Sequence, residues 1–168
     1  LKFKPNALLI GIAPSGGRMP DAWREMIKTA IRNELDILNG LHTILSDDPE
    51  FAALAKEHHC TITDWRKIPL TSEVVSQGNW RSRRAKTILN VGTDCNIGKM
   101  TTMLEVHKEF LHRGLKSDFI GTGQTGMMIS GKGIAVDAII SDYIAGSIEK
   151  EIDESEREKF DYIFVEGQ

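Results

Sequence analysis

The stretch VGTDCNIGKMTT, residues 91–102, lies between an apolar run that predicts a strand (87–91) and a segment that predicts a helix (99–112). In a phosphate-binding loop, glycines let the backbone wrap closely around a phosphate, and successive N–H groups point inward. The helix N-terminus adds positive potential, and a lysine adds a mobile charge. Gly98 and Lys99 meet these requirements, so the stretch predicts a P-loop within an α/β domain.

The predicted P-loop departs from usual magnesium-nucleotide loops at Met100, where a Ser or Thr hydroxyl would normally reach Mg²⁺. We therefore expect phosphate binding and assign no metal ligands. Cys95 lies near a helix N-terminus, which favours a thiolate, but packing beneath the loop is the interpretation that we prefer. The residues predicted to bind the phosphates of a cofactor are Gly92, Thr93, Asp94, Cys95, Asn96, Ile97, Gly98, Lys99, Met100 and Thr101.

A second Gly-rich loop, 121–126, follows a predicted strand at 118–121. Ligands of open parallel sheets bind beyond the carboxyl ends of the strands, so this loop is expected to face the same crevice as the P-loop. Its side chains offer donors for a carboxylate or an acyl oxygen, although an ordinary turn is the alternative. The predicted substrate-binding residues are Thr122, Gly123, Gln124, Thr125 and Gly126.

Two acidic residues are candidates for proton transfer. Glu166 ends the predicted strand 161–165, where a carboxylate can accept a proton or coordinate Mg²⁺. Asp137 lies at the start of a predicted helix, 136–148, and helix capping is its alternative role. With Gln124 as a donor to the acyl oxygen, these residues make up the predicted catalytic set.

The N-terminal part of the chain shows a separate α/β pattern. A strand is predicted at 7–12, followed by a Gly-rich turn at 14–17 and a helix from Pro20 to Leu38. Asp48 and Pro49 predict the start of a further helix, and 60–63 predicts a short strand. The mixed polar segment 65–86, with a basic stretch at its end, predicts a solvated linker, and the charged segment 149–159 predicts a solvated helical face or connection.

The composition narrows the function classes. The 168 residues carry a net charge of -3, with 40% hydrophobic and 27% charged residues, which indicates a globular chain. No basic excess is present to neutralise a nucleic acid, and no apolar run approaches the ~20 residues that span a bilayer. The two cysteines suit a reducing compartment, so we expect a cytoplasmic protein that binds neither nucleic acid nor membrane.

These motifs together resemble a known family. GTDCNIGKMTT, TGQTG and DYIFVEGQ, preceded by LLIGIAPSGGRMPDAWR and GLHTILSDDPEFAALA, are similar to the bacterial and archaeal family that includes D-glutamate N-acetyltransferase. The resemblance implies a Rossmann-like N-terminal domain, of which residues 1–80 would be the C-terminal part and linker. It also implies a P-loop domain similar to dethiobiotin synthetase, of which 81–168 would be the first half. Met100 does not depart from this family's pattern.

The resemblance further implies acetyl transfer from acetyl-CoA to the amine of D-glutamate or a related amino acid. The rival hypotheses are an ATP- and Mg²⁺-dependent carboxylate-activating ligase or kinase, and a nucleotide-binding module without chemistry. The P-loop portion supplies about three strands where doubly wound sheets usually have about five or more. We therefore expect a central fragment, incomplete at both termini, whose partners are an amino-acid substrate, the remaining segments of its own longer chain and further copies in a homo-oligomer.

Overall fold

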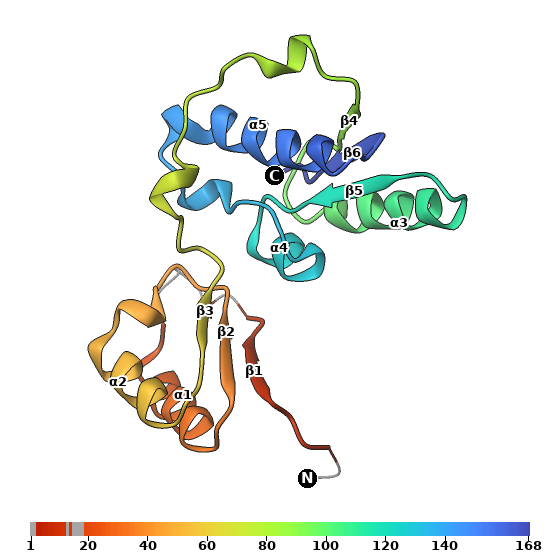
Figure 1. Cartoon of the computed structure of the whole chain (residues 1–168). Coiled ribbons are helices and arrows are strands. Elements are labelled where there is room, and N and C mark those ends of the chain that lie inside the picture. Colours follow the sequence, from red (N-terminus) through yellow and green to blue (C-terminus); the bar gives the residue numbers. More distant parts are fainter. Residues whose placement is uncertain (1–2, 13, 15–18) are drawn as a thin grey trace. The chain divides into compact units, whose positions relative to one another are not determined.

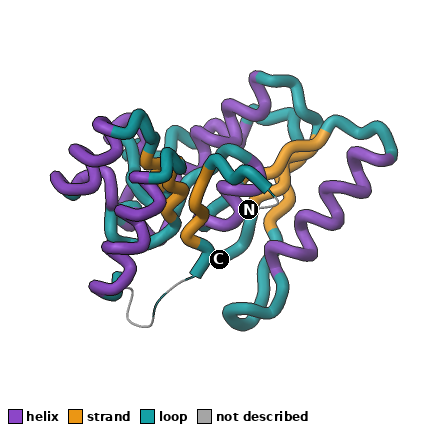
Figure 2. Tube along the Cα trace, turned by 90° about the horizontal axis from the view of Figure 1, so that it is seen from below, coloured by secondary structure: helices purple, strands orange, loops and turns teal. Residues whose placement is uncertain are grey.

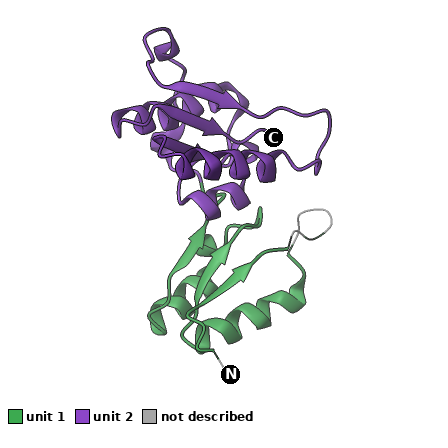
Figure 3. Ribbon diagram, turned by 90° about the vertical axis from the view of Figure 1, so that its right-hand side faces the viewer, with its two compact units in different colours: residues 1–67 green, residues 68–168 purple. Residues whose placement is uncertain are grey.

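The computed structural model describes residues 3–12, 14 and 19–168, which form two compact units, 1–67 and 68–168 (Figure 3). The boundary predicted after residue 80 falls within the second unit. The predicted turn at 14–17 lies outside the described residues except for Pro14. None of the helices in the described residues is long and apolar enough to span a bilayer.

The first unit is a three-stranded parallel sheet with the order β1-β2-β3. Its elements are β1 (Ala7–Ile10), α1 (Asp21–Arg32), β2 (Asp36–Asn39), α2 (Pro49–Glu57) and β3 (Ile62–Asp64). Both helices bury their apolar residues in one core, which includes Ile31 and Phe51 from the helices and Ile37 from the sheet. As predicted, α2 begins at Pro49, where the Asp48 carboxylate accepts hydrogen bonds from the first-turn N–H groups.

The predicted helix from Pro20 to Leu38 is too long at its C-terminal end. The helix α1 ends at Arg32, and Glu34 adopts a left-handed conformation with φ of 59°. The Leu35 N–H then turns back to the Ala30 carbonyl oxygen, at 3.1 Å. Residues 36–39 form the central strand β2, because pairing with two neighbouring strands buries Ile37 completely and outweighs the helical spacing of its apolar residues.

The second unit is a parallel sheet with the order β4-β6-β5, and helices pack on both of its faces at β5 and β6 (Figures 1 and 2). Its elements are β4 (Lys86–Leu89), α3 (Lys99–His112), β5 (Ser117–Ile120), α4 (Gln124–Ser130), α5 (Ser141–Arg157) and β6 (Tyr162–Val165). The helix α3 packs its Met103 against Phe119 and Phe164 on one face, while Ile152 of α5 packs against Ile163 on the other. This layering confirms the predicted α/β class with parallel sheets.

The C-terminal helix differs from its predicted bounds. Residues 136–138 form a short 3-10 turn, and α5 begins at Ser141 rather than at Val136. The charged segment predicted as a solvated face or connection continues α5 to Arg157. Two of its polar side chains, Glu149 and Ser155, are buried. The Ser155 hydroxyl donates to the Glu151 carbonyl oxygen within α5, whereas Glu149 is covered by the preceding chain.

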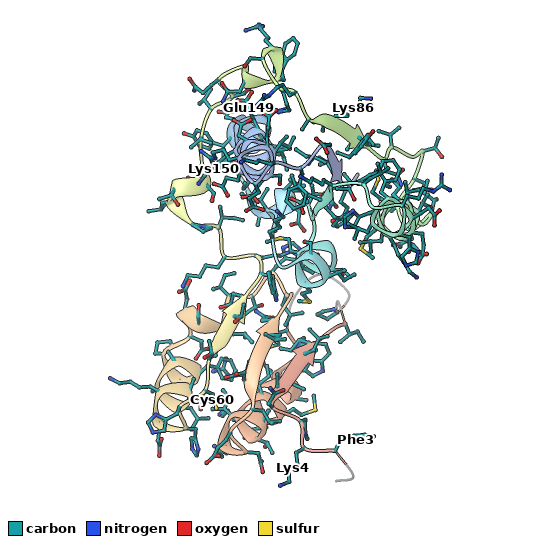
Figure 4. All side chains as sticks on the ribbon, turned by 45° about the vertical axis from the view of Figure 1, so that its right-hand side comes forward. Phe3, Lys4, Cys60, Lys86, Glu149 and Lys150 are labelled. Atoms are coloured by element: carbon teal, nitrogen blue, oxygen red, sulfur yellow. The ribbon has the colours of Figure 1, made fainter. Side chains whose placement is uncertain are left out.

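That covering chain is residues 68–85, which we call the strap. The Glu149 carboxylate on α5 accepts hydrogen bonds from the Gln77 N–H at 2.5 Å, the Asn79 N–H at 2.7 Å and the Ser76 hydroxyl at 3.0 Å (Figure 4). Burial acts to raise the pKa of Glu149, but these donors hold that pKa below its usual value. The strap is therefore a docked part of the second unit, in contrast to the predicted solvated linker.

The basic end of the strap is held in the same way. Arg83, whose side chain is only 8% exposed, forms an ion pair with Asp153 at 2.5 Å. The Glu156 carboxylate accepts the N–H groups of Ala85 and Arg84, which hold the pKa of Glu156 below its usual value. The Arg83 charge and the backbone N–H groups of Arg84 and Ala85 thus bind the strap to α5, in contrast to the predicted linker that keeps two domains apart.

Candidate phosphate-binding site

The predicted P-loop connects β4 to α3 as the sequence indicates. Gly98 precedes the first helical residue with φ of 90°, a left-handed conformation that favours glycine. At Gly92 a Cβ would lie 2.4 Å from the Cδ1 atom of the exposed Ile97 side chain, which would have to move aside. Residues 91–98 are exposed, which leaves the start of α3 open to a ligand.

Within the loop, the Lys99 ammonium donates a hydrogen bond to the Asp94 carbonyl oxygen at 2.7 Å. This bond holds the cation over the loop, and a phosphate oxygen offers a stronger, charged acceptor in its place. Cys95 is exposed, and its N–H donates to the Asp94 carboxylate at 2.7 Å. The prediction that the Cys95 thiol packs beneath the loop is therefore wrong.

Met100 has a structural role that explains the missing hydroxyl. Its side chain joins the core cluster around Met103, Phe119 and Phe164, between α3 and the sheet. A residue that packs inward from the first turn of α3 serves the core and offers no oxygen to a metal ion. Thr101 is exposed beside it.

The second predicted loop is shorter than the sequence suggests. Only residues 121–123 are loop, because Gln124, Thr125 and Gly126 form the first turn of α4. The turn is tight at Gly121, where a Cβ would lie 2.3 Å from the Met127 backbone nitrogen. Gln124 is half-buried and Thr125 is exposed at the start of this helix.

Glu166 follows β6 and lies against the second loop. Its Oε2 atom accepts hydrogen bonds from the Thr122 N–H at 2.8 Å and the Gly123 N–H at 3.1 Å. The Thr122 hydroxyl donates to the Glu166 carbonyl oxygen at 3.0 Å. The sequence places both residues at one edge of the sheet, and the structure shows that they bind each other.

Asp137 lies close to the same loop. The N–H groups of Ile134 and Val136 donate to the carbonyl oxygens of Gly121 and Thr122, at 2.9 and 3.0 Å. These bonds place the exposed residue that follows Val136, Asp137, near the second loop. In residues 3–12, 14 and 19–168, no group of three or more His, Cys, Asp and Glu residues is placed to hold a metal ion.

Three residues that the sequence analysis did not single out connect the two loops. The Asn90 side chain donates to the Lys99 carbonyl oxygen at 2.6 Å. At Gly167 a Cβ would lie 1.7 Å from the Asn90 carbonyl oxygen, so glycine allows β6 to pass this close to the P-loop. The Gln168 side chain donates to the Thr122 hydroxyl at 3.0 Å. Gly167 and Gln168 belong to the DYIFVEGQ motif, and Asn90 lies near the end of the predicted strand 87–91, which were their sequence signals.

Comparison with known proteins extends this description. Residues 1–68 match the Rossmann-like N-terminal domain of the DUF1611 family, and residues 74–168 match its P-loop domain. The chain is also similar to a crystal structure of a DUF1611 family protein from Anabaena variabilis, with 41% identity and a TM-score of 0.92, over 99% of this chain and 48% of that one.

Two curated relatives carry the name D-glutamate N-acetyltransferase. The relative from Tritonibacter scottomollicae is 40% identical over 163 residues, which cover 97% of this chain and 47% of the relative. The relative from Pseudoalteromonas sp is 36% identical over 167 residues, which cover 99% and 49%. The chain thus spans about half the length of these relatives, and their likeness confirms the resemblance noted from the motifs. By its two matched domains, the chain belongs to the DUF1611 family.

Proposed function

We propose that this chain contributes to acetyl-CoA-dependent N-acetylation of D-glutamate or a related amino acid. The two relatives named D-glutamate N-acetyltransferase support the reaction. The observation that carries the ligand assignment is the exposed P-loop with Lys99 over it and Met100 turned into the core. CoA carries a pyrophosphate and a 3′-phosphate, which suit such a loop without a hydroxyl-bound metal.

In the proposed reaction, the amine nitrogen of the amino acid attacks the thioester carbonyl carbon of acetyl-CoA. A C–N bond forms, the C–S bond breaks, and the CoA thiolate leaves. The proton lost by the amine passes to a carboxylate, for which Asp137 and Glu166 are the candidates. It is then transferred to the departing thiolate, which becomes the CoA thiol. The second loop and the first turn of α4, which includes Gln124 and Thr125, orient the acyl oxygen or the acceptor's carboxylate.

The experiment that tests this function uses the protein in its full natural length. Calorimetry with acetyl-CoA, in EDTA and in Mg²⁺, is expected to show binding that does not depend on the metal. Mass spectrometry of products from acetyl-CoA and a panel of D- and L-amino acids is expected to show an N-acetylated D-amino acid. Mg²⁺-dependent ATP binding with no affinity for CoA would instead support the ligase or kinase, and ligand binding without any product would support a binding module.

We also propose that further residues of the same polypeptide pair with β4. This strand lies at one edge of its sheet, and its Leu89 is 57% exposed, although strands of parallel sheets are usually covered on both faces. A groove of about 690 Å³ runs along α3, lined by Val106, Phe110 and Leu115 among others. The expected result is that the β4 amides that do not donate to β6 are protected from hydrogen exchange in the full-length protein but not in the 168-residue chain. A homo-oligomer and a cytoplasmic location stay predictions.

A further inference from the structure

The carboxylate of Glu166 is engaged by the loop beside which it lies. The N–H groups of Thr122 and Gly123, just before α4, both donate to its Oε2 atom. Glu166 is only 8% exposed, and its own N–H donates to the Ile120 carbonyl oxygen at 3.0 Å. The two amides are thus satisfied by an internal anion before any substrate arrives.

The loop is also shaped around this carboxylate. At Gly126 a Cβ would lie 2.1 Å from the Glu166 Oε2 atom and 2.9 Å from its carboxyl carbon. Any side chain at position 126 would therefore displace the carboxylate from the two amides. A glycine at this position in the first turn of α4 leaves the space that Glu166 fills.

Resting on the proposed function, we propose that Glu166 is a positioning residue that holds residues 121–126 in place, and that it is not the base that takes the amine proton. The oxygen that it turns toward the loop already accepts two hydrogen bonds. Asp137 is an exposed acidic residue near the same loop, one residue after Val136, whose N–H donates to the Thr122 carbonyl oxygen. Within this proposal, Asp137 takes the amine proton.

The substitution Glu166→Gln separates the two roles, because both amides donate to one oxygen. The carbonyl oxygen of a glutamine side chain can accept both of those bonds, but a neutral amide cannot act as a general base. In the full-length protein, Glu166→Gln is therefore expected to keep both amides protected and to lower kcat far less than Glu166→Ala does, whereas loss of a general base costs about 100-fold or more. Asp137→Asn is expected to show that larger loss of kcat.

Two further variants should disturb the loop itself. Glu166→Ala removes the acceptor, and Gly126→Ala displaces the carboxylate while leaving Glu166 in the chain. Both are expected to speed hydrogen exchange at the Thr122 and Gly123 amides by at least about tenfold, and to raise KM for the amino acid. Ile129→Ala, at an exposed position of α4, is the matched control and is expected to change neither quantity.

Several outcomes would overturn the proposal. A Glu166→Gln variant that loses activity as severely as Glu166→Ala, with both amides still protected, would make Glu166 the base. Protected amides in Glu166→Ala would show that the carboxylate does not hold the loop. If the wild-type protein forms no acetylated product, the proposed function fails, and the exchange measurements still decide whether Glu166 positions the loop.

Discussion

Replacing Gly146 with alanine should destabilise the second unit, although alanine favours helices. Gly146 is buried in α5 at the point where the strap crosses the helix. A Cβ there would lie 2.0 Å from the Val74 carbonyl oxygen and 2.6 Å from the Ser76 backbone nitrogen. Since non-bonded atoms settle at about 3.5 Å, the strap backbone would have to retreat by more than an ångström.

The change in the free energy of unfolding combines two losses and one gain. Overpacking of this kind costs ~1–3 kcal/mol, and a retreating strap also loses the hydrogen bond from the Ser147 hydroxyl to the Ser72 carbonyl oxygen, ~1 kcal/mol. Alanine in a helix interior gains ~1 kcal/mol over glycine. The expected net loss in the free energy of unfolding is therefore about 1–3 kcal/mol.

The assay is guanidinium unfolding of the 168-residue chain, combined with hydrogen exchange at the strap amides. Gly146→Ala should lower the unfolding midpoint and speed exchange at Gln77 and Asn79, whose N–H groups donate to Glu149. The control is Ala145→Gly at the neighbouring exposed position. It should lower the free energy of unfolding by ~1 kcal/mol without speeding exchange at the Gln77 and Asn79 amides. A Gly146→Ala protein that gains stability with its strap still protected would refute the reasoning.

Three other predictions concern the loop, the strap and the first unit. Lys99→Ala should abolish CoA binding in calorimetry, because it removes the cation at the P-loop. The circular dichroism should stay unchanged, since the ammonium bonds to a carbonyl oxygen of the exposed loop. Cys95→Ala should leave turnover measurable if the amine attacks directly. The pKa of Glu149 is lower in the folded protein than in the unfolded chain. The ionised Glu149 therefore contributes to the free energy of unfolding above pH ~4.3, and this contribution is lost as the pH falls through the pKa of the folded protein. Unfolding midpoints measured against pH should show this loss in the wild type and not in Glu149→Gln. Asp48→Ala should cost ~1–2 kcal/mol in thermal unfolding, since it removes the cap of α2.

Much of the site was predictable from local patterns. The succession of strand, Gly-rich loop and helix around Gly98 depends on residues close together in the chain, so its signal survives without tertiary contacts. The same holds for the start of α2 at Asp48. The cofactor and the bond-making residues stay predictions, because no structural observation reports on an acetyl group or an amine.

The sequence by itself determined the α/β class, the P-loop and the position of Glu166 at the end of a strand. Only the tertiary structure decided that residues 36–39 are a strand, that the strap is bound to α5, and that Glu166 is occupied by two amides. The physical reason is the same in each case. These features depend on partners more than 20 residues away in sequence, such as the 44 residues that separate Thr122 from Glu166, and their contacts outweigh local propensity.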